Sequence, residues 1–255
     1  MPRATLVFVH AHPDDEALLT AGTMARASAA GQRVVLIVAT DGAAGLTSAS
    51  FAQHLARTRA EELARSATAL GIARIVNLGY PDSGLHADVE NGFAHAPREE
   101  VARRISAVLD EEQATVLIGY DPAGGYGHPD HTQVHRVTRD AALLATRRPA
   151  LFEATLPREP IAAAARWAAA LRLTPTDFDP SEFAHAWTPR SQITHRVDVR
   201  KHMGSKVEAL RAHASQASAD GTVRTLSVLT HLPAPLRSVV MGTEYYVRVS
   251  PRAQT

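Results

Sequence analysis

The chain contains no cysteine, which excludes a disulfide framework and any metal site built on thiolates. Its formal net charge is only +1, and basic and aromatic residues do not cluster, so the sequence argues against a nucleic-acid-binding surface. No apolar run approaches the length of a membrane span, and the run that follows Met1 is too short for a signal peptide. We therefore expect a cytoplasmic protein with no membrane or nucleic-acid partner, in which any transition metal is bound by histidine and carboxylate ligands.

The sequence instead contains a regular alternation of apolar strand segments and segments of helical spacing, from Thr5 to about His135. This order predicts an α/β fold with a mostly parallel sheet that is covered by helices on both faces. A chain of 255 residues is long enough for one large domain. We expect residues 1–150 to form its core and residues 151–255 to complete the same globule and the wall of a pocket.

The pattern also predicts the individual elements. The predicted strands are residues 5–9, 34–39, 72–78, 115–120 and 151–156, with further candidates at 222–230 and 245–249. Helices are predicted at residues 16–31, 51–70, 98–112, 160–171 and 199–213, and one more ends near residue 146. Residues 174–189 predict an irregular connection. Trp167, Val207 and Leu210 are expected in the core.

The most informative stretch is Leu6–Glu16, where an apolar strand ends abruptly in two histidines and three carboxylates. With a helix opening at this point, His12 and Asp15 lie three residues apart and can face one point, while Asp14 is aimed elsewhere. This spacing predicts two metal ligands and one free carboxylate. An N-cap with an acidic first turn would explain the carboxylates but not His12.

A second polar cluster, Asp121–His131, also follows a strand and opens a helix. Because parallel strands end at the same edge of a sheet, the two clusters can meet there. A catalytic zinc site needs three protein ligands and one open position, and His12, Asp15 and His131 fit that description. A capped helix start would explain the second cluster alone, but not both clusters. His10 alternates with His12 and is expected to be a hydrogen-bonded core residue.

These clusters predict metal-assisted hydrolysis. Asp14, beside the metal without binding it, is placed to take a proton from metal-bound water. His128 is placed to contact the oxygen that becomes negative when water attacks a carbonyl, and Asp130 could hold that imidazole in its charged form. His135, four residues after His131, is an alternative metal ligand.

The two clusters resemble the LmbE-like, or PIG-L, family of zinc-dependent N-acetylglucosamine deacetylases. The resemblance rests on Ala11-His12-Pro13-Asp14-Asp15-Glu16 and on the segment from Asp121 to His131, and its spacing covers about the first 150 residues. It implies a Rossmann-like sheet and hydrolysis of an N-acetyl group on a glucosamine unit of a small molecule. It also implies one Zn²⁺ per chain, with Fe²⁺ as an alternative in the cell.

The resemblance also assigns roles to single residues. His12, Asp15 and His131 bind zinc, Asp14 is the general base, and His128 stabilises the oxyanion with Asp130 behind it. Arg59 and Glu62 match substrate-site positions on the helix after the second strand, the arginine reaching substrate hydroxyls. Asp82 is expected to contact a sugar hydroxyl, and Tyr126 matches a mobile tyrosine that can approach the carbonyl oxygen. Many members have a glutamate where this chain has Ala43, so no polar sugar contact is expected from that position.

Other functions stay open on the sequence alone. One is an amidase that cleaves a larger acyl group from a glucosaminyl thiol conjugate. Another is a non-catalytic metal-binding or sugar-binding protein, although binding alone needs neither a base nor an oxyanion group. A nucleotide-dependent enzyme is disfavoured because no glycine-rich phosphate loop follows the first strand. A homo-oligomer also stays open.

Overall fold

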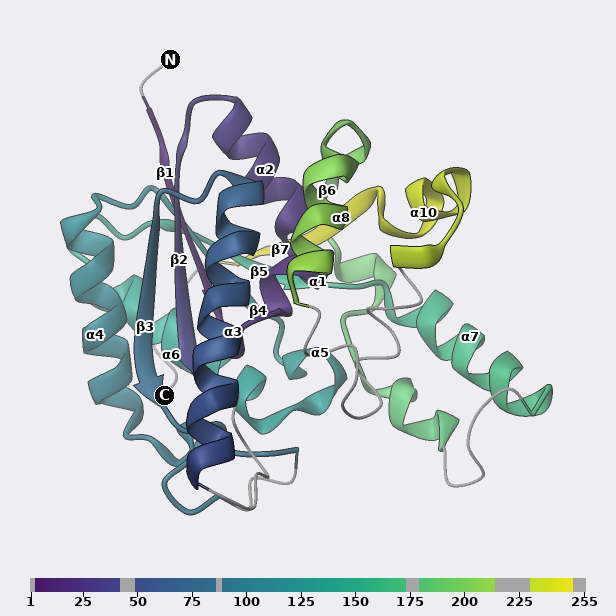
Figure 1. The fold of residues 1–255 in the computed structure, drawn as a ribbon, viewed down its shortest axis with the longest axis horizontal. Coiled ribbons are helices and arrows are strands. Elements are labelled where there is room, and N and C mark those ends of the chain that lie inside the picture. Colours follow the sequence, from purple (N-terminus) through teal and green to yellow (C-terminus); the bar gives the residue numbers. More distant parts are fainter. Residues whose placement is uncertain (1–2, 42–48, 86–88, 173–178, 214–229, 250–255) are drawn as a thin grey trace.

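The computed structural model describes residues 3–41, 49–85, 89–172, 179–213 and 230–249 (Figure 1). In these segments a seven-stranded sheet has the order β3-β2-β1-β4-β5-β7-β6. Its strands are β1 (Thr5–His10), β2 (Arg33–Thr40), β3 (Arg74–Tyr80), β4 (Val116–Tyr120), β5 (Ala150–Thr155), β6 (His195–Asp198) and β7 (Thr243–Val249). Strands β1 to β5 are parallel, whereas β7 and β6 are antiparallel to their neighbours. The predicted mostly parallel, Rossmann-like sheet is confirmed.

Helices of very different lengths join these strands. The α-helices are α1 (Asp15–Leu19), α2 (Ala21–Ala29), α3 (Ala49–Leu70), α4 (Arg98–Glu111), α5 (Gly124–Gly127), α6 (Pro129–Leu144), α7 (Arg158–Ala170), α8 (Met203–Ala212) and α10 (Ala234–Met241). Short 3-10 turns are η1 (Phe93–His95), η2 (Pro180–Ala184), η3 (Arg190–Gln192) and η4 (Arg200–His202). No helix within the described segments is long and apolar enough to span a membrane.

Alternating side chains of the central strand serve two separate cores. Val7 and Val9 of β1 pack into a cluster with α4 and α6, whereas Phe8 between them packs into a cluster with α2, α3 and α8. This period of two is what a strand buried on both faces requires. Helices therefore cover both faces of the sheet, as the sequence predicted (Figure 1).

Two elements depart from the sequence prediction for identifiable reasons. The predicted helix 16–31 is two helices, because the chain leaves helical geometry at Thr20, whose hydroxyl is 2.8 Å from Nε2 of His10. Val207 and Leu210 are buried as expected, but Trp167 is 70% exposed. Its helix, α7, buries only Ala162, so the expectation of a core tryptophan is wrong.

Near the carboxyl terminus the sequence pattern was least informative. The short strand β6 is largely exposed and was not predicted, nor was α10. The candidate strand at 222–230 lies outside the described residues except for Thr230, which is helical. The predicted strand at 245–249 is confirmed as part of β7.

The strand order has a switch point between β1 and β4. From β1 the chain builds outward through β2 to β3, then returns to place β4 on the other side of β1. Phe8 of β1 pairs with Leu36 of β2 on one side and with Ile118 of β4 on the other. The polar clusters follow β1 and β4, so the two strands that precede them are hydrogen-bonded neighbours. Open α/β sheets bind ligands at the carboxyl ends of such strands.

Candidate metal centre

The donor atoms of His12, Asp15 and His131 form a nearly equilateral triangle at the carboxyl ends of β1 and β4. Nδ1 of His12 is 3.4 Å from Oδ2 of Asp15, and Nε2 of His131 is 3.3 Å from that oxygen. The two histidine nitrogens are 3.3 Å apart. A tetrahedral zinc ion with bonds of about 2.0–2.1 Å holds its ligand atoms about 3.3 Å from one another. The three donors therefore fit a single divalent cation of this size.

The other ring nitrogen of His12 contacts a buried carboxylate. Its Nε2 is 3.1 Å from Oδ2 of Asp130, which also accepts the backbone N–H of Ser83 at 3.1 Å. Asp130 is fully buried, and Oδ1 of Asp82 lies 3.5 Å from the same nitrogen. A carboxylate on the second nitrogen of a metal-binding histidine fixes the tautomer and the orientation of the ring. Burial lowers the pKa of His12, but hydrogen bonds with these carboxylates and Asp15 raise it well above its ordinary value.

His128 is the N-cap of α6, and its environment differs from the sequence prediction. Its Nδ1 accepts the backbone N–H of Asp130 at 3.2 Å, whereas the carboxylate of Asp130 turns toward His12. Burial, and then the neighbouring His12 and His131, lower the pKa of His128 to about 4. The hydrogen bond that the sequence led us to expect from the Asp130 carboxylate to His128 goes to His12 instead, and the charged form of His128 stays a prediction. A neutral ring that accepts at Nδ1 carries its proton on Nε2, where it can still donate a hydrogen bond.

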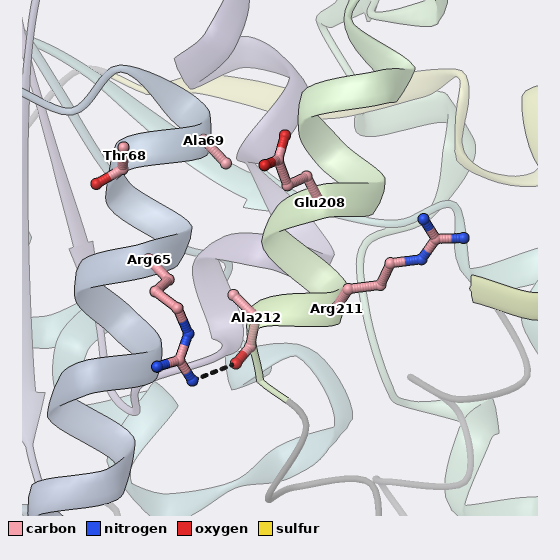
Figure 2. A pocket seen from close by; sticks show the side chains of 6 residues that line it. All are labelled: Arg65, Thr68, Ala69, Glu208, Arg211 and Ala212. Atoms are coloured by element: carbon pink, nitrogen blue, oxygen red, sulfur yellow. Dashed lines mark hydrogen bonds between the residues drawn. The ribbon is translucent and has the colours of Figure 1, made fainter.

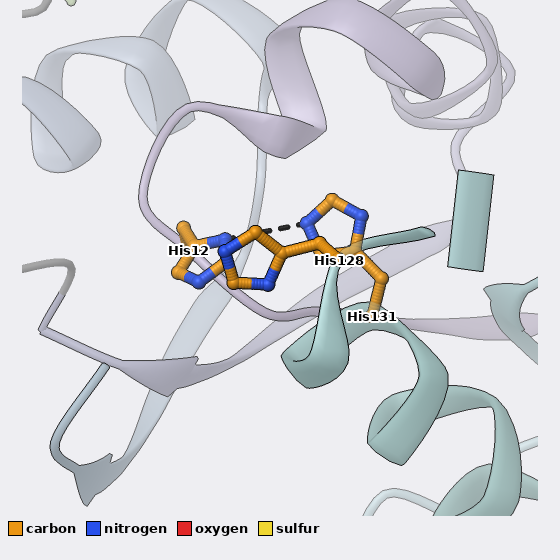
Figure 3. Close-up of side chains that lie close together, drawn as sticks. All are labelled: His12, His128 and His131. Atoms are coloured by element: carbon orange, nitrogen blue, oxygen red, sulfur yellow. Dashed lines mark hydrogen bonds between the residues drawn. The ribbon is translucent and has the colours of Figure 1, made fainter. Parts of the chain in front are cut away.

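Figure 3 shows that the rings of His12, His128 and His131 lie together, from the loop after β1 and the start of α6. Their donor atoms fall within 4.8 Å of one another, as do those of a second group, His12, Asp82, His128 and Asp130. Both groups share His12, so they describe one site. The set with Asp15 has donor distances of 3.3–3.4 Å, which match tetrahedral zinc, and it leaves Nδ1 of His128 to cap α6.

Asp14 lies beside the triangle but outside it. Its backbone has φ 133° and ψ −26°, a region that non-glycine residues rarely adopt, and its N–H donates to Oε2 of Glu16 at 3.0 Å. Burial, followed by the nearby Asp15 carboxylate, raises the pKa of Asp14 to about 7. A carboxyl group with such a pKa can accept a proton near neutral pH, as a general base requires.

Tyr120, which sequence reasoning missed, contacts His131, one of the three candidate donors. Its ring stacks on the ring of His131, with centroids 4.3 Å apart and an angle of 14° between the planes. Its hydroxyl is 3.1 Å from Nδ1 of His10, whose Nε2 bonds to Thr20, so His10 is the buried, hydrogen-bonded residue that was predicted. A large aromatic residue at the end of a buried strand, just before the polar cluster, was the available signal.

His135 lies outside this donor set. Its Nδ1 is 3.1 Å from the backbone oxygen of Tyr120 and 3.3 Å from Oε1 of Glu153. These contacts lie on the β4 and β5 side of α6, so the alternative that made His135 a metal ligand is wrong.

Tyr126 is at the open side of the cluster and is 40% exposed. Its ring centroid is 5.2 Å from that of His131 and 6.0 Å from that of His128. Partial burial, followed by the nearby Asp15 carboxylate, raises the pKa of Tyr126, so its hydroxyl stays protonated. The short segment that carries it is held by Asp121, whose Oδ1 accepts the N–H of Gly125 at 2.9 Å.

The remaining substrate-site candidates are spread over other elements. Arg59 and Glu62 are on α3, where Glu62 is buried and Arg59 is half-buried. Asp82 follows β3 and lies against His12, so the structure brings it to the metal cluster. Its expected contact with a sugar hydroxyl stays a prediction, and Ala43 is outside the described residues.

Comparison with known proteins gives consistent matches. The family model of PIG-L, described as GlcNAc-PI de-N-acetylase, matches residues 7–142. A 1D-myo-inositol 2-acetamido-2-deoxy-alpha-D-glucopyranoside deacetylase of Saccharomonospora viridis is 36% identical over 261 residues, which cover 95% of this chain and 94% of the relative. The deacetylase of the same name from Kineococcus radiotolerans is 34% identical over 268 residues, covering 91% and 74%.

Among solved structures, the N,N'-diacetylchitobiose deacetylase of Pyrococcus horikoshii has a similar fold. It superimposes with a TM-score of 0.62 at 21% sequence identity, covering 98% of this chain and 85% of that one. At this identity the likeness supports the fold alone.

Proposed function

The chain belongs to the PIG-L family of GlcNAc-PI de-N-acetylases, and from this premise we propose that it is a zinc-dependent hydrolase that removes an acetyl group from an N-acetylglucosamine-containing small molecule. The observation that carries the proposal is the triangle of His12, Asp15 and His131 with the carboxyl group of Asp14 beside it. Binding of a metal or a sugar would not need a carboxyl group with a pKa of about 7 at that place.

Different residues of the site would carry out different steps of amide hydrolysis. A divalent cation held by the three donors would polarise the amide carbonyl and make water more acidic. Asp14 takes a proton from the attacking water as its oxygen bonds to the carbonyl carbon, and then delivers the proton to the leaving nitrogen. The C–N bond breaks, and acetate and a free glucosamine amine are released.

Two uncharged donors face the developing oxyanion. Nε2–H of His128 and the hydroxyl of Tyr126 can both donate to the former carbonyl oxygen, which gains negative charge in the transition state. Asp130 and Tyr120 do not contact the substrate in this scheme. They hold the rings of His12 and His131 in place.

The names of the relatives favour one substrate class. Both are deacetylases of an acetamido-deoxy-glucopyranoside linked to myo-inositol, so we propose an N-acetylglucosaminyl inositol as the substrate. We also propose zinc as the ion, because imidazole and carboxylate donors in tetrahedral spacing suit it, while Fe²⁺ is the alternative to test.

The test begins with metal analysis of the purified protein, followed by assays of amine and acetate release. The metal-free protein, reloaded with Zn²⁺ or Fe²⁺, is given N-acetylglucosaminyl inositol and, in parallel, a bulky glucosaminyl thiol amide. Release of acetate from the inositol conjugate is the expected result. Turnover of only the bulky amide would reject the deacetylase in favour of an amidase, and no turnover with His12→Ala is expected because it loses metal.

A further inference from the structure

A buried chain of hydrogen bonds leads from the end of α8 to the backbone of Asp14. Glu16 is fully buried, and its Oε1 accepts the hydroxyl of Ser66 at 2.6 Å and Nε2–H of His213 at 2.7 Å. Its Oε2 accepts the backbone N–H of Asp14 at 3.0 Å. None of these contacts belongs to the metal triangle.

We propose that Glu16, clamped by Ser66 and His213, is a positioning residue that holds Asp14 in the backbone geometry from which its carboxyl group acts. This inference rests on the proposed function, since it gives Asp14 the role of general base.

The backbone of Asp14 needs such support. A non-glycine residue at φ 133° is strained and persists only where its surroundings hold it. Asp14 is the N-cap of α1 but has no side-chain capping bond, so its carboxyl group is left for the site. The bond from its N–H to Glu16 holds the peptide unit before this residue, while its carbonyl oxygen accepts the N–H of Ala17 at 3.0 Å within α1.

Glu16 can supply that support only if its own carboxylate is immobile. Ser66 reaches it from α3, and His213 reaches it from the residue that follows α8. Together the two donors satisfy one oxygen, which turns the other toward Asp14. A fully buried carboxylate with three donors is rigid and ionised, and hydrogen bonds with His213 and Ser66 help to keep the pKa of Glu16 low despite its burial.

The end of α8 is itself fastened to α3. Figure 2 shows a groove between these two helices, where the guanidinium of Arg65 reaches the backbone oxygen of Ala212 at 3.4 Å. Arg65 and Ser66 are neighbours on α3, and Ala212 and His213 are neighbours at the end of α8. The contact between Arg65 and Ala212 therefore joins the two helices at the surface, while the side chains of Ser66 and His213 bond to Glu16 in the interior.

The experiment measures kcat, KM, metal content and backbone amide exchange in four variants of the full chain. His213→Ala removes one donor, whereas His213→Gln keeps an N–H near the place of Nε2. Ser66→Ala removes the second donor, and Thr68→Ala, which deletes an exposed hydroxyl on the same helix, is its matched control.

We expect His213→Ala to lower kcat about 10- to 100-fold, because displacing a catalytic group by about 1 Å costs about 100-fold. KM and bound metal should stay within about twofold of wild type. His213→Gln should recover part of the loss, Ser66→Ala should show a smaller one, and Thr68→Ala should show none. Exchange of the Asp14 amide proton should become faster in His213→Ala.

A double-mutant cycle separates positioning from a general loss of structure. In an Asp14→Asn background, His213→Ala should cause little further loss, because both changes disable the same unit. An equal loss in both backgrounds would overturn the proposal. If His213→Ala does not fold, Ser66→Ala against Thr68→Ala decides in the same way. If the wild-type protein hydrolyses no amide, the proposed function fails. Amide exchange still tests the positioning role of Glu16 in that case. An unchanged exchange rate of the Asp14 amide in the variants would overturn this role, and a faster rate would support it.

Discussion

Replacing Asp130 by alanine is expected to weaken metal binding rather than only the chemical step. Its carboxylate is fully buried and bonds to Nε2 of His12 and to the N–H of Ser83. Without it, the ring of His12 loses the partner that sets its tautomer and orientation, and a buried N–H is left without its acceptor. Loss of such a partner typically lowers metal affinity about 10- to 100-fold, which corresponds to about 1.4–2.7 kcal/mol.

The assay is a competition for Zn²⁺ between the protein and a chromophoric chelator, read as the dissociation constant. Asp140→Ala is the matched control, because it removes a carboxylate from the same helix, where Asp140 pairs with Arg98 away from the site. Its dissociation constant should equal that of wild type. If Asp130→Ala binds zinc as tightly as wild type but turns over slowly, the carboxylate acts on His128 or on substrate, and our reading of its contact with His12 is refuted.

Three further predictions concern the base, the sheet and the Tyr126 segment. Asp14→Asn should keep full metal content and lose about 100- to 10,000-fold in kcat, measured as acetate release; wild-type turnover would contradict the assignment of the base. Hydrogen bonds, of which that from Arg33 has the largest effect, lower the pKa of Glu112 to about 2 from its ordinary 4.5. The ionised carboxylate therefore stabilises the fold above pH 4.5, and this stabilisation is lost as the pH falls toward 2. Glu112→Gln should therefore cost about 1–2 kcal/mol of unfolding free energy at pH 7, after allowance for solvent screening, and nearly nothing at pH 2, with activity unchanged; a pH-independent loss in urea titrations would count against this. Gly125→Ala should lower kcat/KM without metal loss, because Gly125 has φ +67° and an added Cβ would lie 2.7 Å from the ring of Trp187; unchanged kcat/KM would show that the segment tolerates the shift.

Local signals in the sequence were sufficient for strands β1 to β5 and for bringing His12, Asp15 and His131 to one place. Strands β1 to β5 are apolar runs between helices, and the two polar clusters directly follow β1 and β4, so the rule that parallel strands end together brought His12 and His131 to one place. Hydrogen-bonded burial of His10 followed from its alternation with His12 in the same way.

What could not be predicted depends on contacts between distant segments. The choice of Asp130 between His128, two residues away, and His12, 118 residues away, is decided by how α6 meets β1. The bond between Glu16 and His213 spans 197 residues and has no local signature. Trp167 was misplaced because an alanine-rich helix with one apolar face can lie either on the core or, as α7 does, largely in solvent.

The two nitrogens of the His12 imidazole face different partners. Nδ1 faces the donor atom of His131, and Nε2 faces the carboxylate of Asp130. A half-turn of the ring about its Cβ–Cγ bond would present carbon atoms to both, so only one rotational state satisfies the surroundings. A cation bound as we propose would therefore find the His12 ring already oriented, and the raised pKa of His12 means that this ring would lose a proton on binding it. For the proposed zinc site, such a fixed ring would disfavour ions that require wider or higher coordination.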